Sequence, residues 1–316
     1  MVGFAKDPWR LKATIGSKII RDEGQELETD EEKANHLALR NFKWTEEARV
    51  GEEEEVEARH WDRGLLVEKI HTALQGTSNK SAPGPDGASY KLVKLAVKGP
   101  LEDALFEQIT EELSNGIMPE EWQACKVVMI PKPGKDHREA RVWRPINFFN
   151  CVGKLAEKVV ANDLQQIAGL FHKYQFGCRR GRSTIEALFR AVVRSQRCLA
   201  KGGGVVWVME DVQGGFQNVQ WEVVRDRIKG TAAEGWLGWL KTFFRKREFT
   251  IEWDGKKRGQ GRTNVGAPQG SPLSPVLFLI YMAPILEEME KNLIRARLSE
   301  SPEPGSQKVR REWWRS

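Results

Sequence analysis

The sequence has 316 residues, of which 40% are hydrophobic and 30% charged, so it is long enough for a large core with two or three subdomains. No apolar run is long enough to cross a bilayer, and the charged N-terminus is not a signal peptide, which argues against a membrane or secreted protein. The four cysteines lie far apart without zinc-ligand spacing. We interpret them as reduced core thiols of an intracellular protein.

The net charge of +6 is unevenly distributed along the chain. Residues 1–80 carry 13 Lys and Arg against 17 Asp and Glu, whereas residues 81–316 carry 37 against 27. A basic body behind an acidic leader favours a polyanionic partner for the body. A solvated basic surface explains the same numbers, and charge alone does not separate the two interpretations.

Residues 1–60 are predicted to be a leader that contains a helix. Thr29 and Glu32 have the spacing of a capping box, and the apolar positions that follow, from Ala34 to Phe42, recur on one helical face. The acidic run Glu52–Glu55 is interpreted as a solvated linker, because nothing in the sequence gathers its carboxylates around a metal.

Two segments are predicted to bring backbone amides and basic side chains to a phosphate. Residues 78–90 hold two prolines and two glycines around Pro83–Gly87, which predicts a stiff loop, although such a run alone is more often a simple turn. A short strand at Val127–Ile130 then enters a turn that carries Lys132 and returns through Arg144. This hairpin can close over a triphosphate, and a solvated hairpin is the alternative.

A glycine- and arginine-rich loop follows at residues 175–183. Ser183 is predicted to cap the next helix, so Arg179, Arg180 and Arg182 come directly before a helix N-terminus. The first peptide N–H groups of a helix are unpaired and attract anions. The pattern therefore predicts contacts with nucleic-acid phosphates.

The run Val205–Met209 is predicted to be a buried strand, because it is apolar and rich in valine. It delivers Glu210 and Asp211 to its end, followed by two glycines and Phe216. A carboxylate at the end of a buried strand is well placed to ligate a divalent metal. Further on, residues 266–275 form a loop rich in proline and glycine that contains Gln269 and precedes an apolar helix.

Five of these segments, in this order, resemble the reverse transcriptase domain of non-LTR (LINE-like) retrotransposons. The segments are Ser81–Gly87, Ile130–Lys135 with Trp143–Ile146 and Gly153–Lys158, Gln175–Thr184, Asp211–Phe216 and Ala267–Pro275. Each match is weak or moderate by itself, but five in order over residues 78–290 are highly specific.

The resemblance implies an α+β right-hand polymerase fold, helix-rich, with fingers and a partial palm and without a thumb. The expected boundaries are a leader at 1–60, fingers at 61–200, a partial palm at 201–298 and a disordered tail at 299–316. The implied partners are an RNA template, a DNA primer and deoxynucleotide triphosphates, and the implied cofactor is Mg²⁺. The oligomeric state stays open.

The resemblance also assigns roles to single residues. Asp211 matches the first metal-binding aspartate, and Phe216 matches the bulky gate beneath the sugar. Gln269 and Arg144 match nucleotide contacts, and Lys132 is a plausible helper in binding the triphosphate.

One departure bears on activity. The family's adjacent Asp-Asp pair is missing, because no Asp-Asp dipeptide occurs in the chain and no Asp follows Asp254. Two divalent ions beside a triphosphate need several carboxylates. We therefore expect a reverse transcriptase domain that is truncated before this motif and has little or no polymerase activity. The alternative is a non-catalytic fragment that binds RNA or a primer–template.

Overall fold

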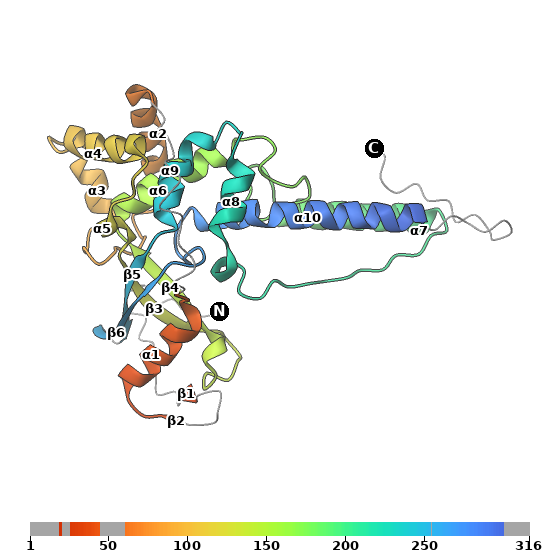
Figure 1. Ribbon diagram of the computed structural model, residues 1–316, viewed down its shortest axis with the longest axis horizontal. Coiled ribbons are helices and arrows are strands. Elements are labelled where there is room, and N and C mark those ends of the chain that lie inside the picture. The colour runs from red at the N-terminus through yellow and green to blue at the C-terminus, as the bar shows by residue number, and fades with distance from the viewer. Residues whose placement is uncertain (1–18, 21–25, 45–60, 254, 300–316) are drawn as a thin grey trace. The chain divides into compact units, whose positions relative to one another are not determined.

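The computed structural model describes residues 19–20, 26–44, 61–253 and 255–299 (Figure 1). They form two compact units: the first within residues 1–167 and 214–278, and the second within residues 168–213 and 279–316. The mixed helical and sheet content agrees with the expected α+β class. The finer division into leader, fingers and palm at residues 60, 200 and 298 stays a prediction. The acidic run Glu52–Glu55 and the tail beyond Ser299 lie outside the described residues.

The first unit is built on a four-stranded sheet with the order β4-β3-β5-β6. The strands are β3 (Cys125–Pro131), β4 (Trp143–Phe149), β5 (Arg247–Trp253) and β6 (Lys256–Thr263). β3 and β4 form an antiparallel hairpin, which confirms the predicted one, and β3 pairs in parallel with β5 from Cys125↔Phe249 to Val127↔Ile251. β6 completes the sheet antiparallel to β5, with a register shift after Ile251.

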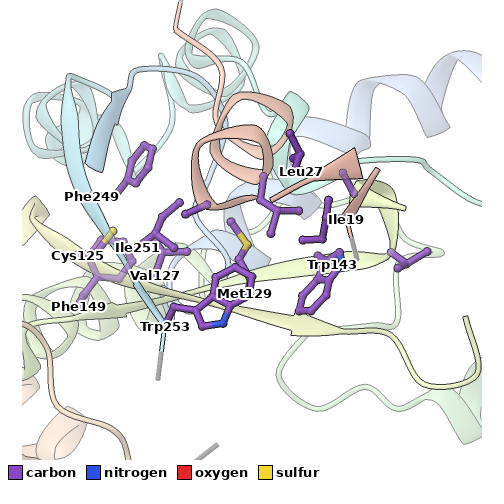
Figure 2. Close-up of a cluster of buried hydrophobic side chains, with 14 residues drawn as sticks. Ile19, Leu27, Cys125, Val127, Met129, Trp143, Phe149, Phe249, Ile251 and Trp253 are labelled. Atoms are coloured by element: carbon purple, nitrogen blue, oxygen red, sulfur yellow. The ribbon is translucent and has the colours of Figure 1, made fainter. Parts of the chain in front are cut away.

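One face of this sheet is covered by the N-terminal elements β1 (Ile19–Ile20), β2 (Glu26–Leu27) and α1 (Asp30–Asn41), as Figure 2 shows. Alternate residues of β3 and β5 point into this core, as the two-residue period of a strand requires. The core comprises Ile19, Leu27, Ala34, Leu37, Cys125, Val127, Met129, Ala140, Val142, Trp143, Phe149, Phe249, Ile251 and Trp253. The leader helix is therefore part of the core of the first unit.

The remaining helices of the first unit gather at the other end of the sheet (Figure 1). They are α2 (Arg63–Gln75), α3 (Tyr90–Ala96), α4 (Glu102–Asn115), α5 (Glu120–Gln123), α6 (Cys151–Leu164), α8 (Trp221–Ile228) and α9 (Leu237–Phe243). The unit also contains three short 3-10 turns: η1 (Ala140–Val142), which lies between β3 and β4 and contacts α1, η2 (Phe216–Asn218) and η3 (Glu234–Trp236). α6 packs against α2, and most of its residues are buried.

The predicted helix caps are confirmed. Thr29 Oγ1 accepts from the Glu32 amide at 3.1 Å while the Glu32 carboxylate accepts from the Thr29 amide at 3.0 Å, so both arms of the capping box are made. Ser183 Oγ accepts from the Glu186 amide at 3.0 Å. The Glu186 carboxylate accepts from Arg182 at 2.8 Å, so this side chain pairs with the arginine loop.

The second unit contains α7 (Thr184–Ala200) and the part of α10 (Ser274–Ser299) that begins at Leu279. Glu290 on α10 accepts from His172 at 3.1 Å and pairs with Lys173 at 2.7 Å. Of the four cysteines, all free, three are buried and Cys178 is exposed with a φ of +55°, so the prediction that all four lie in the core was wrong for Cys178.

The predicted buried strand at Val205–Met209 is also wrong. Residues 203–212 have no regular secondary structure, and Val206, Val208 and Met209 are 89%, 77% and 87% exposed. Valine-rich sequence favours a strand only where a neighbouring strand receives its backbone hydrogen bonds. No strand in the described residues pairs with this segment.

Among the helices that the structure describes, none has both the length and the apolar character to cross a membrane.

The contribution of α1 to the core can be measured with two leucines of the same helix. Leu37 is fully buried and Leu39 is 81% exposed. Leu37→Ala is expected to lower the free energy of unfolding by about 2–5 kcal/mol, because it leaves a cavity in the core. Leu39→Ala is the control and should change it by less than about 0.5 kcal/mol. Urea unfolding followed by tryptophan fluorescence gives both values; equal effects would contradict the packing of α1.

Candidate functional site

The β3–β4 hairpin presents its basic residues to solvent. Arg144 lies opposite Ile130 in the β-ladder and is exposed, while its neighbours on the strand, Trp143 and Pro145, are buried. The Lys132 amide donates to Val142 O at 2.9 Å, and Lys132 Nζ donates to Arg141 O at 3.2 Å. The hairpin thus holds two cationic side chains on a rigid backbone, which suits recognition of an anion.

The loop that carries Gln269 lies directly against β4. Asn147 binds the Gln269 carbonyl twice, from its amide and from Nδ2, each at 2.8 Å. Gly270 has a φ of +116°, and a Cβ at this position would stand 2.2 Å from Asn147 O. Only glycine permits this approach.

Phe216 lies at the other end of the same loop. Its carbonyl accepts from the Ala267 amide at 2.7 Å, and its ring centroid is 5.5 Å from that of Phe278. The structure therefore brings Phe216, the Gln269 loop and the strand that carries Arg144 together within the first unit. These segments are distant in sequence, and the resemblance placed all three at the nucleotide.

A buried arginine holds the start of the loop. Arg247 on β5 is 3% exposed and donates to Phe243 O at 2.8 Å and to Gly266 O at 2.7 Å. Burial lowers the pKa of Arg247 to about 10, although the interactions with Cys125 and Glu157 act to raise it. Arg247 therefore remains charged at neutral pH. Burial also raises the pKa of the Cys125 thiol to about 12, so this thiol is inert.

A buried glutamate holds the end of the loop. Glu157 on α6 is fully buried and accepts a hydrogen bond from the Ser271 hydroxyl. Burial raises the pKa of Glu157 to about 7, although Ser271, Lys154 and Arg247 all oppose the rise. Our sequence reasoning missed both Glu157 and Arg247. The available signal was a charged residue at a position where strand or helix periodicity predicts an apolar one.

The space beneath the loop is small. A cavity of about 30 Å³ lies between the loop, β4 and β5, and Asn147, Arg247 and Gln269 are among its lining residues. This is room for a water molecule and not for a nucleotide. A ligand as large as a nucleotide does not fit inside this cavity.

The end of α1 joins the same region. Gln217 Nε2 donates to Asn41 Oδ1 at 3.2 Å, Lys43 Nζ donates to Asn218 Oδ1 at 3.2 Å, and Thr263 Oγ1 donates to Lys43 O at 2.7 Å. The leader thus fixes the turn that follows Phe216.

The three predicted arginines belong to the second unit. The Arg179 guanidinium lies 4.8 Å from the Phe171 ring centroid, and that of Arg182 lies 5.3 Å from the Phe176 ring centroid. Arg180 is exposed. Burial lowers the pKa of Arg179, and the nearby charge of Arg182 adds to this effect.

Asp211 also belongs to the second unit and is exposed in the segment without regular structure. Within the described ranges, no group of three His, Cys, Asp or Glu side chains is close enough to hold a metal ion. A single exposed aspartate does not fit a site for two Mg²⁺ ions, which require several carboxylates.

Comparison with known proteins gives the family. A family model described as reverse transcriptase (RNA-dependent DNA polymerase) matches residues 130–300, more than half of the chain. This chain belongs to the reverse transcriptase family. The match confirms the resemblance inferred from the motifs, and it spans four of the five motif segments.

Three related sequences come from transposable elements of Drosophila melanogaster. The probable RNA-directed DNA polymerase from transposon BS is 28% identical over 280 residues, which cover 84% of this chain and 31% of the relative. The RNA-directed DNA polymerase from mobile element jockey is 25% identical over a region that covers 73% of this chain and 26% of the relative. The putative 115 kDa protein in type-1 retrotransposable element R1DM is 28% identical over a region that covers 90% of this chain and 28% of the relative. This chain thus spans about a third of the length of these relatives or less.

The close approach of the Gln269 loop to β4 can be tested at Gly270. Gly270→Ala is expected to destabilise the protein by more than Gly134→Ala, whose positive φ alone costs about 1–2 kcal/mol. Both glycines have positive φ, but a Cβ on Gly134 meets no atom within 4 Å. The difference between the two variants in urea unfolding therefore reports the contact with Asn147 O; similar losses would contradict it.

Proposed function

We propose that this chain supplies the nucleotide-contacting face of a retrotransposon reverse transcriptase. In this proposal Arg144 and Lys132 bind the triphosphate, Gln269 contacts the nucleotide, and Phe216 lies beneath the sugar. The RNA template and DNA primer are the partners that the family implies. The observation that carries the proposal is the convergence of three distant segments: Asn147 holds the Gln269 carbonyl at 2.8 Å, and Phe216 O holds the Ala267 amide at 2.7 Å.

The electrostatics of these segments support a polyphosphate ligand. Arg144 is exposed on a rigid strand, so its guanidinium can approach an anion with two parallel hydrogen bonds. Lys132 adds a second positive charge from the same hairpin. The loop behind them is fixed by hydrogen bonds to its backbone, which leaves the Gln269 side chain for a ligand.

We further propose that these 316 residues alone extend a primer poorly or not at all. Asp211 is the proposed metal ligand, and no Asp-Asp dipeptide accompanies it in the sequence. Without enough carboxylates to balance two divalent ions, the transition state for nucleotidyl transfer lacks charge stabilisation that is worth orders of magnitude in rate. No step of the reaction is therefore assigned to a metal on this chain.

A second candidate function, binding of RNA or primer–template without chemistry, is favoured by the arginine loop. Arg179 and Arg182 are held over aromatic rings, which orients their guanidinium groups before any ligand arrives. The exposed Arg180 between them adds charge beside the N-terminus of α7.

The nucleotide site can be tested with Arg144→Ala. The variant is expected to bind a fluorescent deoxynucleotide triphosphate about 10- to 100-fold more weakly, because it loses hydrogen bonds to a charged phosphate. Arg262→Ala is the matched control, since Arg262 is an exposed arginine on β6 whose guanidinium lies over Trp44. It should leave the affinity unchanged. Equal losses of affinity in both variants would mean that only the net charge of the protein matters, and would overturn the assignment of Arg144 to the triphosphate.

The same proteins, assayed for primer extension with Mg²⁺ or Mn²⁺, test the proposed lack of activity. We expect no template-dependent extension above background. Extension that Asp211→Ala abolishes would show that this chain does hold its catalytic metals.

The binding function predicts a salt dependence. Affinity for single-stranded RNA should fall as salt rises, and Arg180→Ala should weaken binding and reduce the slope of log affinity against log salt by about one. Arg138→Ala is the control, because Arg138 is an exposed arginine outside the arginine loop, where it pairs with Asp136 at 2.6 Å. Filter binding at four salt concentrations measures the slopes. A wild-type affinity that does not respond to salt would exclude phosphate contacts.

A further inference from the structure

Two loops that are far apart in sequence are joined by one helix. α6 carries Lys154 and Glu157, which are three residues apart and therefore lie on one face of the helix. Lys154 Nζ donates to Ala82 O at 2.8 Å, in the loop of residues 81–87. Glu157 accepts from Ser271, in the Gln269 loop. A single buried surface of α6 thus contacts the first and the last of the five motif segments.

Ser271 connects Glu157 to the start of α10. Its hydroxyl oxygen accepts from the Leu273 amide at 3.1 Å and from the Ser274 amide at 3.3 Å, while its proton goes to Glu157. The hydroxyl group is therefore fully used, and its orientation is set by the carboxyl group. Ser274 Oγ in turn donates to Pro268 O at 2.8 Å, which closes the loop on itself.

The chain of contacts leads from Glu157 to Gln269. Ser271 is two residues from Gln269, and the intervening Gly270 is pressed against Asn147 O. Since Asn147 fixes only the Gln269 carbonyl, Ser271 is needed to define the direction of the chain on the other side of Gly270. Loss of the Glu157 acceptor would leave a buried hydroxyl proton without a partner, and the loop would have to rearrange.

We propose that Glu157 is a positioning residue for the Gln269 loop, acting through Ser271 to hold Gln269 in the orientation that meets the nucleotide. The contact with nucleotide rests on the proposed function, whereas the positioning of the loop does not. Glu157 acts through another residue and has no contact with the ligand itself.

The surroundings of the carboxyl group give the proposal a pH signature. Lys154 on α6, Arg247 on β5, Cys125 on β3 and Tyr90 on α3 are the titratable groups that interact with it. Its pKa in the closed loop is raised to about 7 by burial. Opening the loop hydrates the carboxyl group and returns its pKa to the ordinary value, so opening releases a proton between these two values. The protection of the loop amides from hydrogen exchange is therefore complete at low pH and is lost as the pH rises to about 7.

Hydrogen exchange measured by mass spectrometry on the full chain tests this proposal. Glu157→Leu removes the acceptor, and Ser271→Ala removes the intermediate hydroxyl. Glu157→Gln keeps an oxygen that can accept from Ser271 but cannot ionise. At pH 5, Glu157→Leu and Ser271→Ala should each speed exchange in a peptide covering residues 269–276 by about tenfold, as expected for a lost buried hydrogen bond, whereas Glu157→Gln should exchange like the wild type. Glu121→Gln, at an exposed position on α5, is the control.

The pH profile separates positioning from general destabilisation. After correction for intrinsic exchange rates, wild-type protection of this peptide should fall from pH 5 to pH 7, and that of Glu157→Gln should stay constant while exchange in the β3–β4 peptides is unchanged. Exchange in Glu157→Leu that matches Glu121→Gln at pH 5, or a wild-type profile without pH dependence, would overturn the proposal. If the loop responds as expected but the wild type binds no nucleotide, the positioning role stands and the proposed function fails.

Discussion

The parallel pairing of β3 with β5 is the interaction on which the first unit depends. Three residue pairs, from Cys125↔Phe249 to Val127↔Ile251, join segments more than 120 positions apart in the sequence. Closing so long a loop costs chain entropy that short-range contacts do not recover. The cost is offset by the core, in which alternate side chains of both strands meet the leader helix (Figure 2). Once the strands are paired, β4 and the loop after β6 have little freedom.

This pairing also explains why charged side chains are buried next to the candidate site. Arg247 begins β5 on the same face as Phe249 and Ile251, so the register of the strand forces it into the interior. There its donors find the carbonyl groups of Phe243 and Gly266. The charges of Glu157 and Arg247 interact with each other. Glu157 also interacts with the charge of Lys154, and Arg247 interacts with Cys125. A buried charge is tolerated where such partners are fixed in place.

Local signals predicted many elements correctly because their causes are local. Thr29 and Ser183 cap helices through contacts within a few residues, and the predicted strand at Val127 alternates between buried and less buried residues. Motif order identified the family for a similar reason, since each motif is a short run. The prediction failed at Val205–Met209, where apolar composition favours a strand but the partner strand is a property of the whole fold. Glu157 and Arg247 were missed because their partners are remote in sequence.

The exposure of Cys178 gives the protein a single chemically accessible thiol. Cys125, Cys151 and Cys198 are buried, and burial raises the pKa of the first two, so little thiolate forms at neutral pH. Cys178 directly precedes Arg179 in the arginine loop. An alkylating dye will therefore attach at one position of the native chain, beside the arginines. The same residue makes this loop the place where oxidation would join two molecules through a disulfide.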